Sequence, residues 1–412
     1  MTRPRRSWAT ATTAGLALTL SIAGASAAPA PLPSTAAPAT ATATAGEATT
    51  GTATATAAAA AAATSVATSA ELPRPTGPYA VGRDTVHLVD TGRPDPWVPS
   101  AGPRRLMVSM YYPARRGTDG PTAPYMTTEE ARFLLRLRAP DATVAPEVIS
   151  GVRTWSHTDA RPRPGRFPLV VLSPGFTFPR STLTGLAEDL ASRGYVVAAV
   201  DHPYENAGTT LPDGRTLPCA LCDEPPAGGM AAVARSRAVD VSFLLDRLTA
   251  RHPAWLHARM IDPKRIGMAG HSIGGAASAA TMAADPRVRA GADMDGTVFA
   301  PVPDTGLDGR PFLLFGARAR TLDETWDHTW AHLDGWKRWL TVDGAGHGSF
   351  TDVPLLADLA GIPDATPLSF ARELALTRAY VAAFFDRHLK GTAQPLLDGP
   401  SAANPEVTVR RP

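Results

Sequence analysis

A serine within a glycine-rich turn is the residue of this chain best suited to covalent chemistry. Gly270-His271-Ser272-Ile273-Gly274 follows the apolar run Ile266–Ala269 and opens a run of small residues, Ile273–Ala284. A strand, a tight turn and a helix, in that order, form the nucleophile elbow of serine hydrolases, and its glycines let the strand and the helix approach closely. The pattern predicts that Ser272 is a nucleophile at a helix N-terminus, where developing negative charge is stabilised.

A serine hydroxyl needs a general base, and His347 is the best placed histidine for that role. It lies in the glycine-rich segment Gly344–Phe350, directly after the apolar run Trp339–Val342. It also follows the serine in the chain, as the histidine does in α/β-hydrolases. We therefore expect His347 to take the proton of Ser272, and we expect activity to fall at acid pH as the imidazole becomes protonated.

Two carboxylates are candidates for the group that orients this imidazole. Asp295 directly follows the apolar run Ala290–Met294. Asp323 comes after Phe312–Phe315, at the position more usual for the acid of α/β-hydrolases. Either carboxylate could hold the imidazole tautomer and stabilise imidazolium. The spacing along the chain leaves both residues open.

The oxyanion of an acyl-transfer reaction needs hydrogen-bond donors, which in this fold are backbone amides. The amide next to the nucleophile belongs to Ile273. The second donor is expected in the loop after Pro168–Leu172, where Ser173-Pro174-Gly175 makes a turn and Phe176 follows. We therefore expect the N–H groups of Phe176 and Ile273 to form the oxyanion hole.

The elements that must position these residues alternate between strand and helix patterns. Such alternation predicts a mostly parallel sheet with helices on both faces, which is the α/β-hydrolase fold. We expect one catalytic domain over residues 73–398, a C-terminal tail over 399–412, and an inserted helical, lid-like segment at 114–166. Within the insert, Thr127-Thr128-Glu129-Glu130 is typical of a capping box. The remaining expected strands are Thr85–Val89, Leu106–Tyr112 and Tyr195–Val200, and the remaining expected helices are Thr182–Arg193, Ala232–Ala250 and Ala371–Leu389.

The N-terminus has the pattern of an export signal. Three arginines (Arg3, Arg5 and Arg6) precede an apolar stretch, and Ala25-Ser26-Ala27 is a small-residue cleavage site. We expect a signal peptide at 1–27 and a secreted, extracellular protein. Residues 28–72 are mostly Ala, Thr and Pro, so they are expected to form a disordered linker.

Composition and the remaining residue types narrow the function further. A net charge of +2, without blocks of like charge, speaks against a nucleic-acid partner. Cys219 and Cys222 are the two cysteines, and in an exported protein we expect them to form a disulfide. His328 and His332 are spaced i, i+4 but lack the Glu of a metalloprotease helix, so they are interpreted as surface or pocket-wall residues. No metal and no organic cofactor is expected.

Several motifs together resemble the platelet-activating-factor acetylhydrolase family of α/β-hydrolases and its bacterial secreted lipase-like members. They are Gly77-Pro78-Tyr79-Ala80-Val81-Gly82, Met110-Tyr111-Tyr112-Pro113, Ser173-Pro174-Gly175-Phe176, Glu188–Tyr195, Val200-Asp201-His202, Gly270–Gly275, Met294-Asp295-Gly296 and His347–Asp352. Family members often have His-Gly where this chain has Pro174-Gly175. The resemblance covers roughly residues 75–390. It implies that Asp295 is the orienting acid, and that lipid esters are substrates.

The sequence therefore predicts a serine hydrolase that cleaves carboxylic esters through an acyl-enzyme. The expected partner is a small-molecule or lipid ester, with transient contact to a lipid interface. Short-chain esters or polyesters are the alternative within this class. A serine peptidase with the same triad, or a silent hydrolase fold used for binding, are alternatives from other classes. The oligomeric state is left open.

Overall fold

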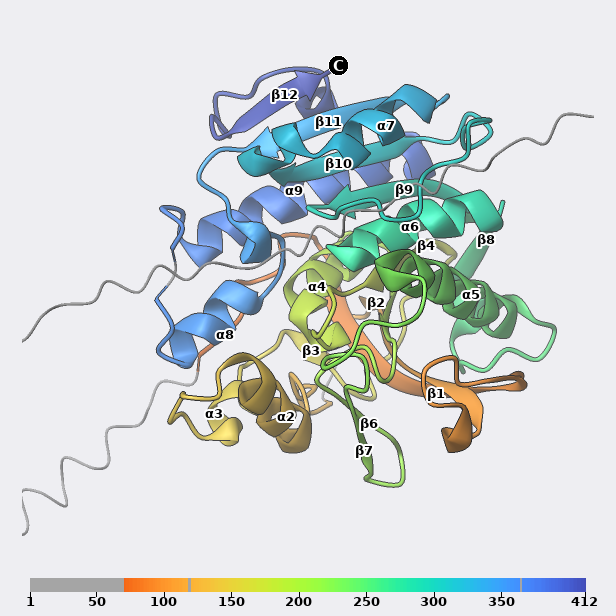
Figure 1. The fold of residues 1–412 in the computed structure, drawn as a ribbon, viewed down its shortest axis with the longest axis vertical. Coiled ribbons are helices and arrows are strands. Elements are labelled where there is room, and N and C mark those ends of the chain that lie inside the picture. Colours follow the sequence, from red (N-terminus) through yellow and green to blue (C-terminus); the bar gives the residue numbers. More distant parts are fainter. Residues whose placement is uncertain (1–69, 118–119, 364) are drawn as a thin grey trace, which may run out of the picture. The chain divides into compact units, whose positions relative to one another are not determined.

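A ten-stranded sheet forms the centre of the part of the chain that this computed structural model describes, which is residues 70–117, 120–363 and 365–412 (Figure 1). Its strand order is β12-β11-β10-β9-β8-β4-β5-β2-β1-β3. The six strands from β11 to β5 run parallel, whereas β2 pairs antiparallel with both β5 and β1 and β12 pairs antiparallel with β11. The strands of this sheet are β1 (Ala80–Pro94), β2 (Pro103–Ala114), β3 (Ser156–His157), β4 (Phe167–Ser173), β5 (Val196–Asp201), β8 (Ile261–His271), β9 (Val288–Met294), β10 (Phe312–Ala317), β11 (Lys337–Val342) and β12 (Val407–Arg411). A separate hairpin pairs β6 (Gly208–Thr210) with β7 (Thr216–Pro218).

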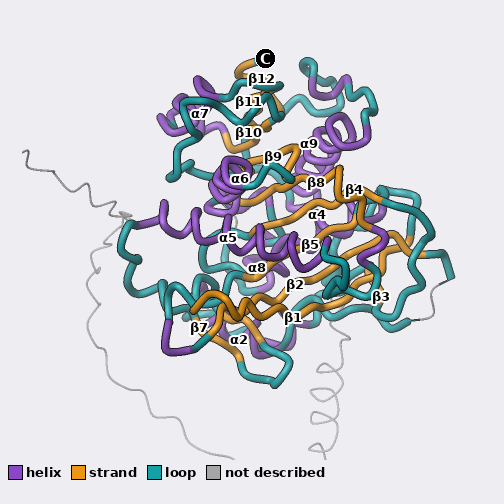
Figure 2. Tube along the Cα trace, turned by 90° about the vertical axis from the view of Figure 1, so that its right-hand side faces the viewer, coloured by secondary structure: helices purple, strands orange, loops and turns teal. Residues whose placement is uncertain are grey.

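Helices cover both faces of this sheet (Figures 1 and 2). One hydrophobic cluster joins one face to α5, α6 and α7, and a second joins the other face to α4 and α9. Strand β5 is buried along its whole length, as expected for a parallel strand that is covered on both sides. The helices are α2 (Thr128–Arg138), α3 (Pro146–Ser150), α4 (Thr184–Ser192), α5 (Gly229–Thr249), α6 (Ile273–Ala284), α7 (Glu324–His332), α8 (Val353–Leu359) and α9 (Phe370–Lys390). The expected α/β-hydrolase fold is confirmed.

The inserted segment contributes α2, α3 and β3. Helix α2 begins with the capping box expected from the sequence: the Thr127 hydroxyl accepts from the Glu130 amide at 3.1 Å, and the Glu130 carboxylate accepts from the Thr127 amide at 3.0 Å. A hydrophobic cluster joins the insert to α8, through residues such as Leu134, Ile149 and Leu356. Among the described residues, none of the helices combines the length and the hydropathy needed to span a bilayer.

Two domain boundaries differ from those expected. Residues 399–412 are not a free tail, because they include β12, which extends the sheet beside β11. The pattern was too short to reveal a strand, since Val407 and Val409 are its only large apolar residues. At the other end, Leu72 is buried and its amide donates to the Arg153 carbonyl at 3.0 Å, so Leu72 belongs to the domain and not to the linker. The expected signal peptide and residues 28–69 of the expected linker lie outside the described residues.

Candidate active site

The turn between β8 and α6 holds Ser272 in a strained backbone conformation. Its φ is 56° and its ψ is −125°, a combination that side chains rarely adopt outside sharply built turns. A Cβ added at Gly270 would lie 2.1 Å from the carbonyl carbon of Gly274, and one added at Gly274 would lie 2.0 Å from the Ser173 carbonyl oxygen. Both glycines are therefore required by close backbone approach, and Ser272 sits at the N-terminus of α6 as the sequence predicts.

His347 connects this serine to Asp295. Its Nε2 lies 3.0 Å from the Ser272 Oγ, and its Nδ1 lies 2.5 Å from the Asp295 Oδ2. The Asp295 side chain is only 2% exposed, whereas that of His347 is 51% exposed. The imidazole therefore lies between a buried carboxylate and a hydroxyl, with its ring open to an incoming ligand.

Asp295 is fixed from several sides. It has a φ of 60°, its Oδ1 accepts from the Ala317 amide at 2.7 Å, and Arg320 approaches the same oxygen to 3.2 Å. Asp323 has a different environment: it caps the N-terminus of α7 by accepting from the Thr325 amide at 2.9 Å, and it accepts from Arg320 at 2.8 Å. The structure thus brings Asp295, and not Asp323, to the imidazole.

The loop after β4 packs against the elbow. A Cβ added at Gly175 would lie 2.8 Å from the His271 Nδ1, so the glycine is needed for this close contact. Arg237 of α5 donates to the Pro174 carbonyl at 2.5 Å and so fixes this loop against α5. Among the described residues, the amide of Phe176 has no hydrogen-bond partner, and that of Ile273, at the first position of α6, has none within its own helix.

His271 is a positioning residue that sequence reasoning left without a specific role. It is buried, and its Nε2 donates to the His347 carbonyl at 2.7 Å. Burial, with a further contribution from the neighbouring imidazole, lowers the pKa of His271 to about 3. The ring therefore stays neutral, and it holds the backbone of the histidine loop against the elbow.

Comparisons with known proteins identify the family. The family model for platelet-activating factor acetylhydrolase, isoform II, matches residues 64–213. A protein of Arthroderma benhamiae named as a probable 1-alkyl-2-acetylglycerophosphocholine esterase is 30% identical over 379 residues, which are 83% of this chain and 94% of that protein. The chain belongs to the platelet-activating factor acetylhydrolase family. It is therefore a carboxylic ester hydrolase.

Two further proteins similar to this chain are named as hydrolases of ester substrates. The solved structure of a ferulic acid esterase from Streptomyces cinnamoneus superposes with a TM-score of 0.76, at 46% identity, over 83% of this chain and 100% of that one. A bis(hydroxyethyl) terephthalate hydrolase of Streptomyces coelicolor is 32% identical over 126 residues, which are 31% of this chain and 32% of that protein.

An apolar cavity of about 240 Å³ lies between the insert and α8 of this acetylhydrolase-family member. Its walls come from α2 and α3 of the insert, from α8, and from Phe178. Phe178 lies two residues after Phe176 in the same loop, and Val353, which also lines the cavity, lies six residues after His347. The insert thus supplies one wall of a cavity whose other wall is formed by α8 and Phe178.

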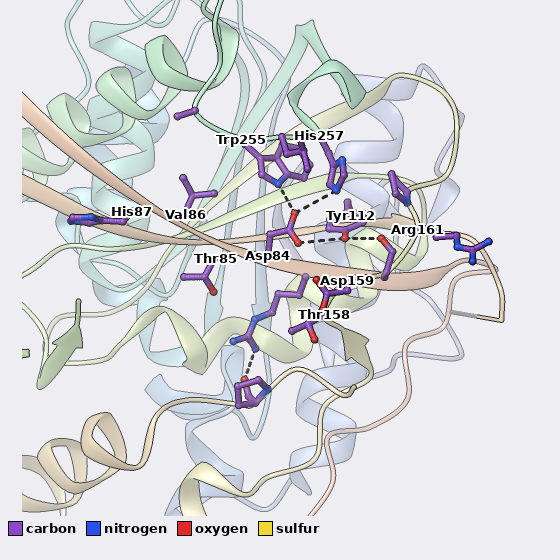
Figure 3. Close-up of a pocket in the computed structure, with 16 residues that line it drawn as sticks. Asp84, Thr85, Val86, His87, Tyr112, Thr158, Asp159, Arg161, Trp255 and His257 are labelled. Carbon is purple, nitrogen blue, oxygen red and sulfur yellow. Dashed lines mark hydrogen bonds and ion pairs between the residues drawn. The ribbon is translucent and has the colours of Figure 1, made fainter. Parts of the chain in front are cut away.

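A larger cavity, of about 900 Å³, lies beside β1 and β2 (Figure 3). It is lined by Asp84 and Tyr112 on β1 and β2, and by Trp255 and His257, which precede β8. Since Ser272 follows the opposite end of β8, and three strands separate β8 from β1, this cavity is remote from the triad. Trp255 Nε1 donates to Asp84 there at 2.7 Å, which is a structural contact.

Asp352 ties the histidine loop to the insert of this acetylhydrolase-family enzyme. It is fully buried, and it accepts from the Gly185 amide at 3.1 Å and from the Tyr125 hydroxyl at 3.2 Å. Burial raises the pKa of Asp352 to about 7, even though these hydrogen bonds and the charge of Arg378 act to lower it. The fold therefore favours the neutral carboxyl.

The raised pKa predicts a loss of stability between acid and neutral pH that Asp352→Asn should remove. A carboxyl whose pKa is higher in the folded than in the unfolded state stabilises the fold fully at low pH, and this contribution is lost as the pH rises to about 7. We expect the free energy of unfolding of the unmodified protein, relative to the variant, to fall by on the order of 2 kcal/mol between pH 5 and pH 8. Urea titrations of both proteins at the two pH values measure this difference, and parallel pH dependences would contradict it.

The sulfurs of Cys219 and Cys222 are bonded to each other in the loop after β7. His202 lies at the end of β5, buried, with its Nδ1 2.8 Å from Asp240 and its Nε2 3.1 Å from the Ser173 hydroxyl. His202 therefore links the end of β4 to α5 through buried hydrogen bonds and does not line the site.

Proposed function

We propose that this protein is a secreted serine esterase in which Ser272 is the nucleophile, His347 the general base and Asp295 the orienting acid. The contact between the His347 Nε2 and the Ser272 Oγ, at 3.0 Å, is the observation that carries this proposal. It places the proton of the hydroxyl within reach of a base whose other nitrogen is held by a carboxylate.

The reaction proceeds in two acyl-transfer steps. Ser272 attacks the ester carbonyl while His347 takes the hydroxyl proton, and the negative charge that develops on the carbonyl oxygen is bound by the amides of Phe176 and Ile273. His347 then gives the proton to the leaving alcohol, which leaves an acyl group on Ser272. A water molecule, deprotonated by His347, releases the acid and regenerates the serine. Asp295 stabilises the imidazolium that forms in each step.

We assign the apolar cavity between the insert and α8 to the acyl group, which favours esters that carry an apolar chain or ring. Its lining is almost entirely aliphatic and aromatic, and its single charged side chain is Arg138, whose guanidinium carbon lies 5.0 Å from the centre of the Phe178 ring. Such a lining stabilises a hydrocarbon group and offers little to a polar one. Lipid esters are therefore the proposed substrates, in keeping with the name of the Arthroderma relative. Aromatic acyl esters are the second candidate, which the 46% identical ferulic acid esterase favours.

Filling this cavity is expected to discriminate between acyl chain lengths. Ala357 of α8 lines the cavity, and Ala357→Leu takes up part of its volume. We expect kcat/KM for a p-nitrophenyl octanoate to fall roughly tenfold or more, while kcat/KM for the acetate stays within about twofold. Feruloyl esters belong in the same panel, because they test the aromatic alternative.

The matched control is Ala375→Leu, at an exposed position of α9, which should leave both rates unchanged. Equal losses for acetate and octanoate in Ala357→Leu would contradict the assignment of the cavity to the acyl group, without bearing on the triad. A preference of the unmodified enzyme for peptides over all esters would instead favour the peptidase alternative.

Export is proposed from the N-terminal pattern, and the bonded pair Cys219–Cys222 is in keeping with an oxidising compartment. Protein recovered from the culture medium of an expressing cell should begin at Ala28, after cleavage behind Ala27. A mature chain that stays inside the cell and begins at Met1 would contradict export.

A further inference from the structure

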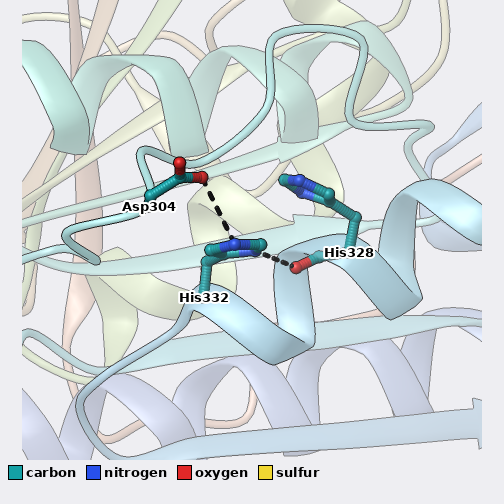
Figure 4. A group of neighbouring side chains, drawn as sticks. All are labelled: Asp304, His328 and His332. Carbon is teal, nitrogen blue, oxygen red and sulfur yellow. Dashed lines mark hydrogen bonds and ion pairs between the residues drawn. The ribbon is translucent and has the colours of Figure 1, made fainter.

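Two histidines of α7 and one aspartate lie together on the surface, outside the catalytic site. His328 and His332 project from the same side of the helix, one turn apart, and Asp304 reaches toward them from the loop between β9 and β10 (Figure 4). One ligand atom from each of the three residues lies within 4.8 Å of the other two. The sequence shows the spacing of the histidines, but it does not show the aspartate that joins them.

The hydrogen bonding of His332 prepares one of its nitrogens for a cation. Its Nδ1 lies 2.8 Å from the His328 carbonyl oxygen, and because that oxygen can only accept, Nδ1 carries the proton. In the neutral ring Nε2 then has a lone pair, and it faces the Asp304 Oδ1 at 3.3 Å. A lone pair and a carboxylate repel each other unless a positive charge lies between them or on the ring. Histidines that bind metals show the same arrangement, with the second nitrogen bonded to a backbone carbonyl.

The separations match those of a small divalent ion. Metal–ligand bonds of about 2.0–2.1 Å in a tetrahedron place two ligand atoms about 3.3–3.4 Å apart. The distance from the His332 Nε2 to the Asp304 Oδ1 is 3.3 Å and so already fits. The His328 ring stacks on that of His332, with centroids 4.2 Å apart. It is exposed and free to change rotamer, and one of its nitrogens already lies within 4.8 Å of the other two ligand atoms.

The geometry points to a surface site for Zn²⁺ formed by Asp304, His328 and His332, with water as the fourth ligand. Two imidazoles and one carboxylate select zinc and similar transition metals over Ca²⁺ and Mg²⁺, which prefer oxygen ligands throughout.

Zinc at this position would join α7 to the loop that follows Asp295. The loop from Gly296 to Pro311 is tied at one end by the Val298 amide, which donates to the Thr325 hydroxyl at 2.9 Å, and at the other by the Leu307 amide, which donates to Asp334 at 2.8 Å. Asp304 lies between these ties, and its side chain is 91% exposed. A metal bond from Asp304 to α7 would fasten the middle of the loop and so stabilise the folded state by linkage.

Titration of the untagged full-length protein with ZnCl₂ tests the site. We expect calorimetry to give a dissociation constant in the micromolar range, and we expect zinc to raise the melting temperature by a few degrees. Co²⁺ in place of zinc should give the visible absorption of a four-coordinate ion. His328→Ala and His332→Ala should each weaken binding at least tenfold, and Asp304→Asn should weaken it measurably, while the ester hydrolysis of all three without metal stays as in the unmodified protein.

The matched control is His252→Ala, at an exposed histidine elsewhere on the surface, which should bind zinc as the unmodified protein does. All the exchanged side chains are at least partly exposed, so the variants are expected to fold, and circular dichroism checks this. Zinc binding and zinc stabilisation that persist undiminished in a His328→Ala/His332→Ala double variant would overturn the proposal. So would a dissociation constant in the millimolar range for the unmodified protein.

Discussion

Ser272→Ala is expected to lower kcat/KM for a p-nitrophenyl ester by roughly 10⁵- to 10⁶-fold. The variant keeps the elbow, because alanine replaces serine in the same backbone conformation, and it keeps the amides of Phe176 and Ile273. It loses the atom to which the acyl group is transferred. Any remaining rate should come from oxyanion binding to an attacking water, which in other serine hydrolases leaves a small residual acceleration.

Fluorophosphonate labelling gives an independent reading of the same variant. The unmodified enzyme should be labelled at one serine, and Ser272→Ala should not be labelled. The matched control is Ser181→Ala, five residues after Phe176. The Ser181 hydroxyl is buried and has no hydrogen-bond partner among the described residues. Labelling that survives in Ser272→Ala, or activity within a hundredfold of the unmodified enzyme, would rule out Ser272 as the nucleophile.

Asp295→Asn is expected to lower kcat by about 10⁴-fold, whereas Asp323→Asn should change it by less than about tenfold. The Ala317 amide donates to Oδ1 of Asp295, so the asparagine must place its oxygen there and its NH₂ group toward His347. The Nδ1 of His347 must then accept a hydrogen bond from this NH₂ group, so the proton of the neutral ring lies on Nε2. The imidazole is left in the tautomer that cannot take the proton of Ser272.

Asp323→Asn should instead reduce stability. Asp323 caps α7 and pairs with Arg320. Asparagine can keep the cap, because it is as good an N-cap residue as aspartate, but it loses the ion pair, which costs up to about 1 kcal/mol. Thermal melts and kinetics on both variants therefore give opposite patterns: lost turnover with a stable fold for one, and retained turnover with a lower melting temperature for the other. Equal losses of turnover in both would refute the assignment of Asp295.

Local sequence patterns mark Ser272 and His347 as candidates, and the structure brings their side chains to 3.0 Å of each other. A strand, two glycines and a helix form the elbow within a dozen residues, and α6 begins and ends as expected. The choice between Asp295 and Asp323 could not be made from chain position, because each follows a strand and β9 and β10 are neighbours in the sheet. Only the resemblance to the family pointed to Asp295. The distance from each carboxylate to the His347 imidazole depends on how the loops after β9, β10 and β11 pack against one another, and no local sequence pattern specifies that packing.

The contributions of the insert and of the surface histidines show the same limit. The capping box before α2 was visible in the sequence, but the contact of α2 and α3 with α8 depends on tertiary packing. His328 and His332 showed their spacing, while Asp304 lies 24 residues before the first of them and is brought near by the intervening strand and loop. Buried groups such as His271 and Asp352 were identifiable by type, but not by environment.

The last strand, β12, forms an edge of the sheet, where a strand of a second molecule could otherwise pair. Without residues 399–412, the backbone donors and acceptors of β11 would face solvent and offer a template for sideways strand addition, the usual route to aggregation. With β12 in place, this edge of the sheet is a five-residue strand that ends in Arg410 and Arg411, and charged residues on a short edge strand disfavour strand addition. Truncation at the C-terminus is therefore expected to lower solubility, so purification tags are better placed at the N-terminal side.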